Sequence, residues 1–316
     1  MKKCILNVSL ILTTILFLIC SCSKDQFSDT MTVDNSQSKQ KESRAVFNSS
    51  KSMIDEYVQL SKYSQDDLDN WIRTKGFKSA LSVEKTSDNT LLSRPHYLRA
   101  ILNENLEFQI QDTVIWYNKG KLYILSSNKD DDYQTLLSRK SNPTQLAVLG
   151  SSEVDLIEVE SENTEKSKTK TIPVNDGYTG GLKTFQFKCT ANPNVTFRYY
   201  HELAAHHFSV AGTYISELNY MANLQYLQGS WLTASYPRNL NFRFFGSVSY
   251  PAKGKSFSFN DHPVALKNVT GNTTINLATV NPASSLRQSW QVSLSGSAAH
   301  TMVNYPDTQW WYDFGY

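Results

Sequence analysis

Cysteine is scarce in this sequence: the 316 residues contain four, at positions 4, 20, 22 and 189. If a leader is removed and Cys22 is modified, as argued below, Cys189 has no partner within the chain. A disulfide scaffold and a multi-cysteine zinc site are therefore excluded. We expect Cys189, which follows the alternating run FQFK, to be a packed strand residue.

An excess of charge of one sign is also lacking. The formal charge is +2, from 31 basic and 29 acidic residues. Lys2 and Lys3 belong to the expected leader, so the remaining chain carries equal numbers of both signs. Region 178–316 has 9 basic and 5 acidic residues, an imbalance too small to indicate a partner. Binding to nucleic acid needs a basic face, so we expect no nucleic-acid partner.

Common catalytic signatures are missing as well: there is no G-x-S-x-G elbow, glycine-rich phosphate loop or cysteine cluster. The stretch YYHELAAHHF (199–208) comes near the zinc-peptidase motif, but His206 and His207 follow His201 by five and six positions instead of four. Alternating apolar residues over 195–203 predict a strand, on which His201 and His206 face opposite sides. We therefore predict no metal, no cofactor and no catalytic residue. A sharp turn at Ala204-Ala205, which would bring the histidines together, is the alternative.

A hydrophobic run opens the chain. Residues 5–19 are mostly apolar, too few to span a membrane comfortably, and follow two lysines, so residues 1–21 are predicted to be a secretory signal peptide. The run ends in Ile19-Cys20-Ser21-Cys22, which resembles a bacterial lipobox. Ser21 is the small residue before the cut and Ile19 the aliphatic residue, so Cys22 is the predicted site of lipid attachment. The expected address is the cell envelope, with the membrane reached through the lipid, including palmitate.

Composition divides the remaining chain into four parts. Residues 22–48 are polar and predict a disordered tether. Residues 49–158 predict a small α+β domain, and the charged stretch 159–183 predicts a linker. Residues 184–316 consist of short alternating runs between turns and predict an antiparallel β-sandwich of roughly eight strands.

Two local patterns are clear within 49–158. Ser64 has the character of a helix N-cap, an apolar stripe follows it, and Gly76 is the expected C-cap. The stretch VIWYNKGKLYIL (114–125) predicts a hairpin around a glycine-containing turn. The acidic triplet 130–132 lacks the ligand spacing of a calcium loop, so a solvated turn is expected there.

Aromatic residues are concentrated in the second half of the chain, where 25 of 38 fall within 178–316. In the last predicted strand, Trp310, Tyr312, Phe314 and Tyr316 share one face, which we expect to be buried, and Trp311 lies on the other. Exposed tryptophan rings can stack on the apolar faces of sugars. Trp231 and Trp311 are therefore the candidate ligand-binding residues.

The lipobox, the stretches SQDDLDNWIRTKGFKS (64–79) and LNENLEFQIQDTVIWYNKGKLYIL (102–125), and the aromatic second half resemble uncharacterised cell-envelope lipoproteins of gut Bacteroidetes with a domain of unknown function. The resemblance implies an envelope address, which in this lineage points to the outer membrane with its periplasmic or surface face left open. It also implies a β-rich C-terminal domain, and it brings no known reaction.

These observations favour a lipid-anchored envelope protein that works by binding or as a structural component, with a glycan or another envelope protein as its partner. The alternative is a hydrolase acting on polysaccharide or peptide at the envelope. Exposed tryptophans without a carboxylate pair favour the binding protein. Two carboxylates converging in a cleft favour the hydrolase.

Overall fold

The structure is a computed structural model. It describes residues 43–82, 91, 94–128, 130–156, 176–179, 182–190, 192–284 and 289–316. These belong to one compact unit, Lys41–Tyr316. The unit is mostly β, and its described strand pairs are antiparallel apart from β1 with β2.

The helical elements are α2 (Ser50–Leu60), α3 (Gln65–Lys75), η1 (Ala80–Ser82), α5 (His96–Ile101), α6 (Tyr133–Lys140), η2 (Pro143–Gln145) and η3 (Pro251–Lys253). The strands are β1 (Val46–Phe47), β2 (Glu107–Ile110), β3 (Thr113–Asn118), β4 (Lys121–Ser126), β5 (Val148–Leu156), β6 (Asp176–Thr179), β7 (Leu182–Cys189), β8 (Asn192–Val210), β9 (Thr213–Gln228), β10 (Ser230–Thr233), β11 (Arg238–Tyr250), β12 (Lys255–Val269), β13 (Thr273–Val280), β14 (Gln291–Met302) and β15 (Tyr305–Gly315).

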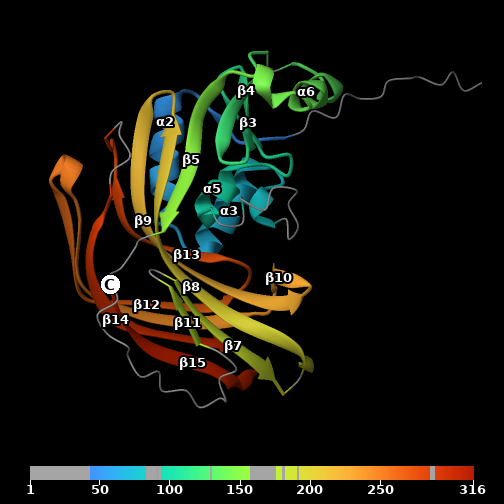
Figure 1. Ribbon diagram of the computed structural model, residues 1–316. Helices are drawn as coiled ribbons and strands as arrows, with labels where there is room; N and C mark the ends of the chain where they lie inside the picture. Colours follow the sequence, from blue (N-terminus) through green and yellow to red (C-terminus); the bar gives the residue numbers. More distant parts are fainter. Residues whose placement is uncertain are drawn as a thin grey trace, which may run out of the picture. The chain divides into compact units, whose positions relative to one another are not determined.

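A long hairpin of β8 and β9 organises the larger, 11-stranded sheet (Figure 1). Its turn, Ala211-Gly212, has positive φ at both residues, as a two-residue hairpin turn requires. One edge of β8 pairs first with β7 and then with β5, while the outer edge of β9 pairs with β13 and β10. Strands from the two regions predicted to be separate domains thus share one sheet.

The hairpin contributes to two hydrophobic cores, because side chains on a strand alternate between its faces. Near one end, Phe197, Tyr199 and Leu203 pack towards the four-stranded sheet β12-β11-β14-β15. Near the other end, Phe208 and Val210 pack on the opposite face with residues of α2, α3 and α5. Figure 1 shows these helices beside the upper part of the large sheet, with the smaller sheet below its lower part.

The two local patterns predicted in 49–158 are confirmed. The helix α3 begins at a capping box in which the hydroxyl of Ser64 accepts from the backbone of Asp67, and it ends at Gly76 in the left-handed conformation. Strands β3 and β4 form the predicted hairpin, with positive φ at Lys119 and Gly120.

The acidic triplet lies in a turn with Asp130 and Asp132 exposed, as expected, and it leads into a helix, α6, that was not predicted. The carboxylate of Asp132 accepts from the backbone N–H of Thr135 at 2.9 Å and caps α6. Asp131 pairs with Arg139 of the same helix at 2.8 Å. Both carboxylates therefore contribute to the helix, and that of Asp132 does so while exposed to solvent.

Several predicted segments lie outside the described residues: the signal peptide, Cys22, all but the end of the tether, and most of the linker. The last part of the linker forms β6 and the beginning of β7. Of the helices within the described ranges, none has the length and apolar character needed to cross a membrane.

Candidate functional site

The stretch 199–208 lies within β8 and is a strand, as predicted. The strand pairs continuously with β9 through Ala204 and Ala205, so the alternative with a sharp turn there is wrong. His201 and His206 are both buried and lie on opposite faces. His201 joins the core between the two sheets, and His206 bonds to Tyr57 of α2.

His201 belongs to a directional chain of hydrogen bonds inside that core. Arg238 can only donate, so Nε2 of His300, 3.4 Å from its Nη1, is the acceptor. The Nδ1–H of His300 then donates to Nε2 of His201 at 2.9 Å. Nδ1–H of His201 donates in turn to the hydroxyl of Tyr312 at 2.9 Å. Both imidazoles are neutral in this arrangement.

The surroundings of these hydrogen-bonded side chains also favour the neutral form of both imidazoles. Burial, followed by the charge of Arg238, holds the pKa of both His201 and His300 well below the usual range. Burial also lowers the pKa of Arg238 to about 10. The group lies within the hydrophobic core and joins the two sheets, so we assign it a structural role.

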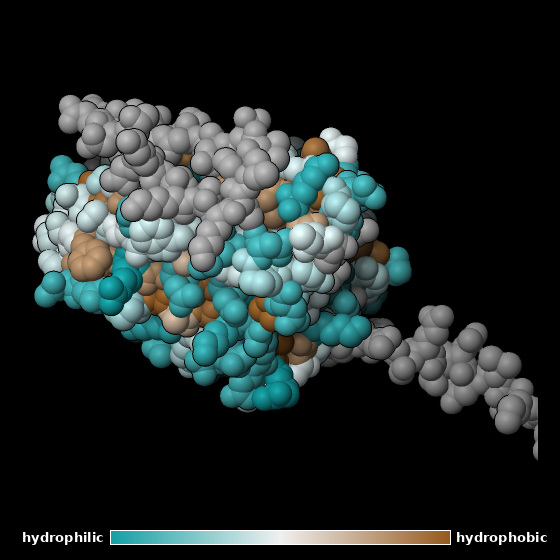
Figure 2. Space-filling view, turned by 90° about the horizontal axis from the view of Figure 1, so that it is seen from below, coloured by the Kyte–Doolittle hydropathy of each residue, from teal (hydrophilic) through white to brown (hydrophobic). Residues whose placement is uncertain are grey.

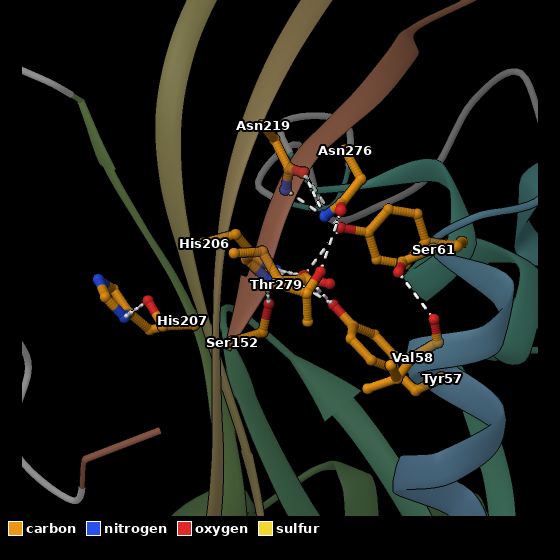
Figure 3. Close-up of polar contacts among 12 residues, drawn as sticks. Tyr57, Val58, Ser61, Ser152, His206, His207, Asn219, Asn276 and Thr279 are labelled. Atoms are coloured by element: carbon orange, nitrogen blue, oxygen red, sulfur yellow. Dashed lines mark hydrogen bonds and ion pairs between the residues drawn. The ribbon is translucent and has the colours of Figure 1, made fainter. Parts of the chain in front are cut away.

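His206 stands in a second buried network, drawn in Figure 3. A carboxylate only accepts, so Nδ1–H of His206 donates to Oε2 of Glu217 at 3.0 Å. The opposite ring nitrogen, Nε2, then accepts from the hydroxyl of Ser152 at 2.7 Å. Serine, histidine and carboxylate are thus linked in the order used by hydrolase triads.

Burial argues against catalysis by this network. Ser152, His206 and Glu217 are all essentially inaccessible to solvent, so a substrate has no approach to the serine hydroxyl. The hydroxyls of Tyr57 and Tyr97 both donate to the same Oε2 of Glu217 at 2.8 Å. These tyrosines come from α2 and α5, so the network fastens the two helices to the sheet. Figure 3 shows Tyr57 reaching from its helix towards the two strands.

A more accessible group lies on the outer face of the large sheet, away from the core between the sheets. Trp231 of β10 is half-buried, and the guanidinium carbon of Arg198 lies 4.3 Å from the centroid of its ring. The ring of Tyr200 is 5.5 Å from the same carbon. The Nε–H of Arg198 donates to Oε1 of Gln225 at 2.6 Å, which orients the guanidinium. One cation is thus held beside two aromatic rings.

Two buried hydrogen-bonding residues, Glu202 and Asn223, lie on the same face of the sheet. Tyr200 donates to Oε2 of Glu202 at 2.5 Å, and burial raises the pKa of that carboxyl group against the effect of this bond. Asn223 is buried, and its Oδ1 accepts no hydrogen bond within the described part of the chain. We call Arg198, Tyr200, Glu202, Asn223, Gln225 and Trp231 together the Trp231 platform.

The second predicted tryptophan is elsewhere. Trp311 is 37 % exposed on the outer face of the smaller sheet, while Trp310, Tyr312 and Phe314 are buried, as the alternation predicted. The core between the sheets separates Trp311 from Trp231, so they do not form a single site. Figure 2, which views the molecule from below Figure 1, shows a mainly hydrophilic face with scattered small hydrophobic areas.

Acidic groups are dispersed in the second half of the chain. Glu202 and Glu217 share one face of the hairpin, but the strand register places them four residues apart, about 13 Å along the strands at the usual rise. Asp261 pairs with Arg243 at 3.3 Å. Within the described ranges, no cluster of three or more histidine, cysteine, aspartate or glutamate residues is placed to hold a metal ion.

Sequence reasoning proposed Trp231 and missed its partners. Arg198 and Tyr200 precede it by about thirty positions, and only the register of β8 with β9 and of β9 with β10 brings them together. The available signal was the alternation of 195–203, which places both side chains on the face opposite the core. Ser152 and Glu217 carried no local signal, because their partner His206 lies on a different strand from either of them.

No known protein family matches this chain, and no curated protein matches it. A solved structure of a DUF4848 family protein from Bacteroides thetaiotaomicron is similar to this chain with 10% sequence identity and a TM-score of 0.20. The similarity covers 88% of this chain and 98% of that chain.

Proposed function

We propose that this protein is a lipid-anchored cell-envelope protein that binds a glycan at the Trp231 platform. The observation that carries the proposal is the position of Trp231, half-buried beside Arg198 and accompanied by Tyr200. A fixed aromatic ring offers a flat surface to the C–H groups of a sugar at little cost in conformational entropy.

The polar members of the platform suit the other surfaces of a sugar. Hydroxyl groups both donate and accept hydrogen bonds, so a glycan needs acceptors and donors placed around the stacked ring. Arg198 supplies donors at the accessible surface. The acceptors Glu202 and Asn223 are buried, so a sugar hydroxyl reaches them only if binding makes these side chains accessible.

The envelope address rests on the sequence alone, through the lipobox ending at Cys22 and the polar residues that follow it. We also propose the finer division of the fold, an α+β region before residue 158 and an antiparallel sandwich after residue 184. The core between the two sheets, whose buried members all lie within 185–314, supports the second part of this division, whereas the core against the helices also takes in Phe208, Val210 and Ile215.

The hydrolase is the weaker reading. A glycosidase needs two carboxyl groups about 5–10 Å apart at the sugar, and the platform contains only Glu202. The serine–histidine–glutamate chain lies in the interior, away from solvent. Both observations favour binding over hydrolysis.

The proposal is tested by affinity electrophoresis of the full chain, in detergent, through gels containing different soluble polysaccharides. We expect retardation by at least one polysaccharide, loss of retardation in Trp231→Ala, and normal retardation in the matched variant Trp311→Ala. Absence of retardation with every polysaccharide contradicts the proposal. Equal retardation of wild type and Trp231→Ala contradicts the assigned site.

A further inference from the structure

The charge on the outer face of β7, β8, β9 and β10 is unbalanced. Strand alternation and register place Lys188, Arg198 and Glu202 on this face, opposite the core residues Phe187, Phe197 and Tyr199. The basic groups are half-buried or exposed, whereas Glu202 is buried. Burial also raises the pKa of Glu202. The accessible part of the face is therefore positive.

Arg198 is oriented for an anion. Its Nε–H is engaged by Gln225, and its plane is held by the ring of Trp231. None of the ion pairs among the described residues includes Arg198. The Nη1 and Nη2 groups form the planar fork that binds a carboxylate through two parallel hydrogen bonds. Partial burial lowers the pKa of Arg198, which reflects incomplete hydration of the cation.

The end of the platform farthest from Arg198 carries hydrogen-bond acceptors instead of a cation. Glu202 lies four residues from Arg198 on the same face, about 13 Å away at the usual strand rise. Its carboxyl group accepts a hydrogen bond from Tyr200, and Oδ1 of Asn223 is a buried acceptor without a partner in the described part of the chain. A ligand that contacts both ends carries an anion at one end and hydroxyl donors at the other, and it is longer than one sugar ring.

From this arrangement we infer that the Trp231 platform takes a glycan with carboxylate groups on its sugar rings, with Arg198 binding a carboxylate while Trp231 and Tyr200 contact ring faces. The inference rests on the proposed function and names its ligand class. Arg198 acts as the residue that separates acidic from neutral glycans.

The test measures binding of the full chain, in detergent, to polygalacturonate and to the same polymer with its carboxyl groups reduced. Dextran sulfate and dextran form a second pair, in which the anion is a sulfate. We expect polygalacturonate to bind about tenfold more tightly than its reduced form, the difference that one charge-assisted pair contributes. Arg198→Gln should abolish the difference, and the matched variant Lys267→Gln, exposed on β12 of the other sheet, should preserve it.

The outcomes separate this inference from the proposed function. Equal binding of polygalacturonate and its reduced form overturns the carboxylate inference and leaves glycan binding standing. Binding of dextran sulfate as tight as that of polygalacturonate shows recognition of charge alone and also overturns it. If neither these polymers nor the wider polysaccharide panel bind, the proposed function itself fails.

Discussion

Mild acid should unfold this protein, because three of its buried histidines are held neutral. Of the six histidines, His96, His201 and His300 are buried and have a lowered pKa, which for His96 is about 3. Burial is the main cause in each case. In the chain from Arg238 to Tyr312, both nitrogens of His201 and of His300 are committed to hydrogen bonds, so an added proton would break a bond.

The direction and size of this pH effect on the free energy of unfolding follow from proton linkage. A histidine with a depressed folded pKa gains protons only after unfolding, so its contribution is present above the unfolded pKa of about 6.5 and is lost as the pH falls. Each such histidine then lowers the free energy of unfolding by about 1.4 kcal/mol for each pH unit below pH 6, so three lower it by about 4 kcal/mol per unit. Between pH 7 and 5 the loss is about 6 kcal/mol, comparable with the whole stability of many domains.

Two other buried groups have opposite effects. Burial lowers the pKa of His206, which adds to the loss, and raises the pKa of Glu202, which lets the folded chain bind a proton first. The three histidines whose pKa lies furthest below the usual range dominate the slope.

The slope of the free energy of unfolding against pH is measured by urea unfolding at about pH 7, 6 and 5, with tryptophan fluorescence as the signal. His96→Leu should reduce it by about a third, because one of three titrating groups is removed. The exposed His262→Gln should leave it unchanged. Stability that is constant or rises between pH 6 and 5 would refute the reasoning, as would an unchanged slope in His96→Leu.

Three further predictions concern packing and the anchor. Tyr57→Phe should lower the free energy of unfolding by about 1.5–3 kcal/mol, because it removes a hydrogen-bond donor from the buried carboxylate of Glu217. In the same urea assay, the control Tyr236→Phe, at an exposed position, should change it by less than about 0.5 kcal/mol. Trp310→Ala should cost about 3–5 kcal/mol and Trp311→Ala much less, since only the first ring is buried; equal small costs would contradict the assigned faces. Cys22→Ser should release the chain from the membrane fraction or leave an unprocessed precursor, and undiminished lipid labelling of this variant would place the attachment elsewhere.

Local signals in the sequence were sufficient for local structure. The cap at Ser64, the turn at Gly120 and the alternation before Trp311 each depend on residues a few positions apart, and each predicted the observed element. The helix α6 was missed because the acidic residues before it were interpreted only as a turn. The capping hydrogen bond of Asp132 shows that this turn also begins a helix.

The buried networks could not be predicted because they depend on pairing between distant strands and helices. Tyr57 meets Glu217 across 160 positions, and His201 meets His300 across 99. The same limit applied to the Trp231 platform. An exposed tryptophan could be proposed from its residue type, but its cationic neighbour follows only from the register of β8, β9 and β10.

The central claim, a glycan bound at the Trp231 platform, is tested most directly through the indole N–H signals of the six tryptophans. Their resonances are recorded in the 15N-labelled full chain, in detergent, while neutral and acidic oligosaccharides are added, and Trp231→Phe identifies the signal of that residue. The account predicts that the Trp231 signal shifts with a bound oligosaccharide while the signals of the buried Trp290 and Trp310 stay in place. A shift confined to Trp311, or no shift at any tryptophan with any oligosaccharide, would contradict it.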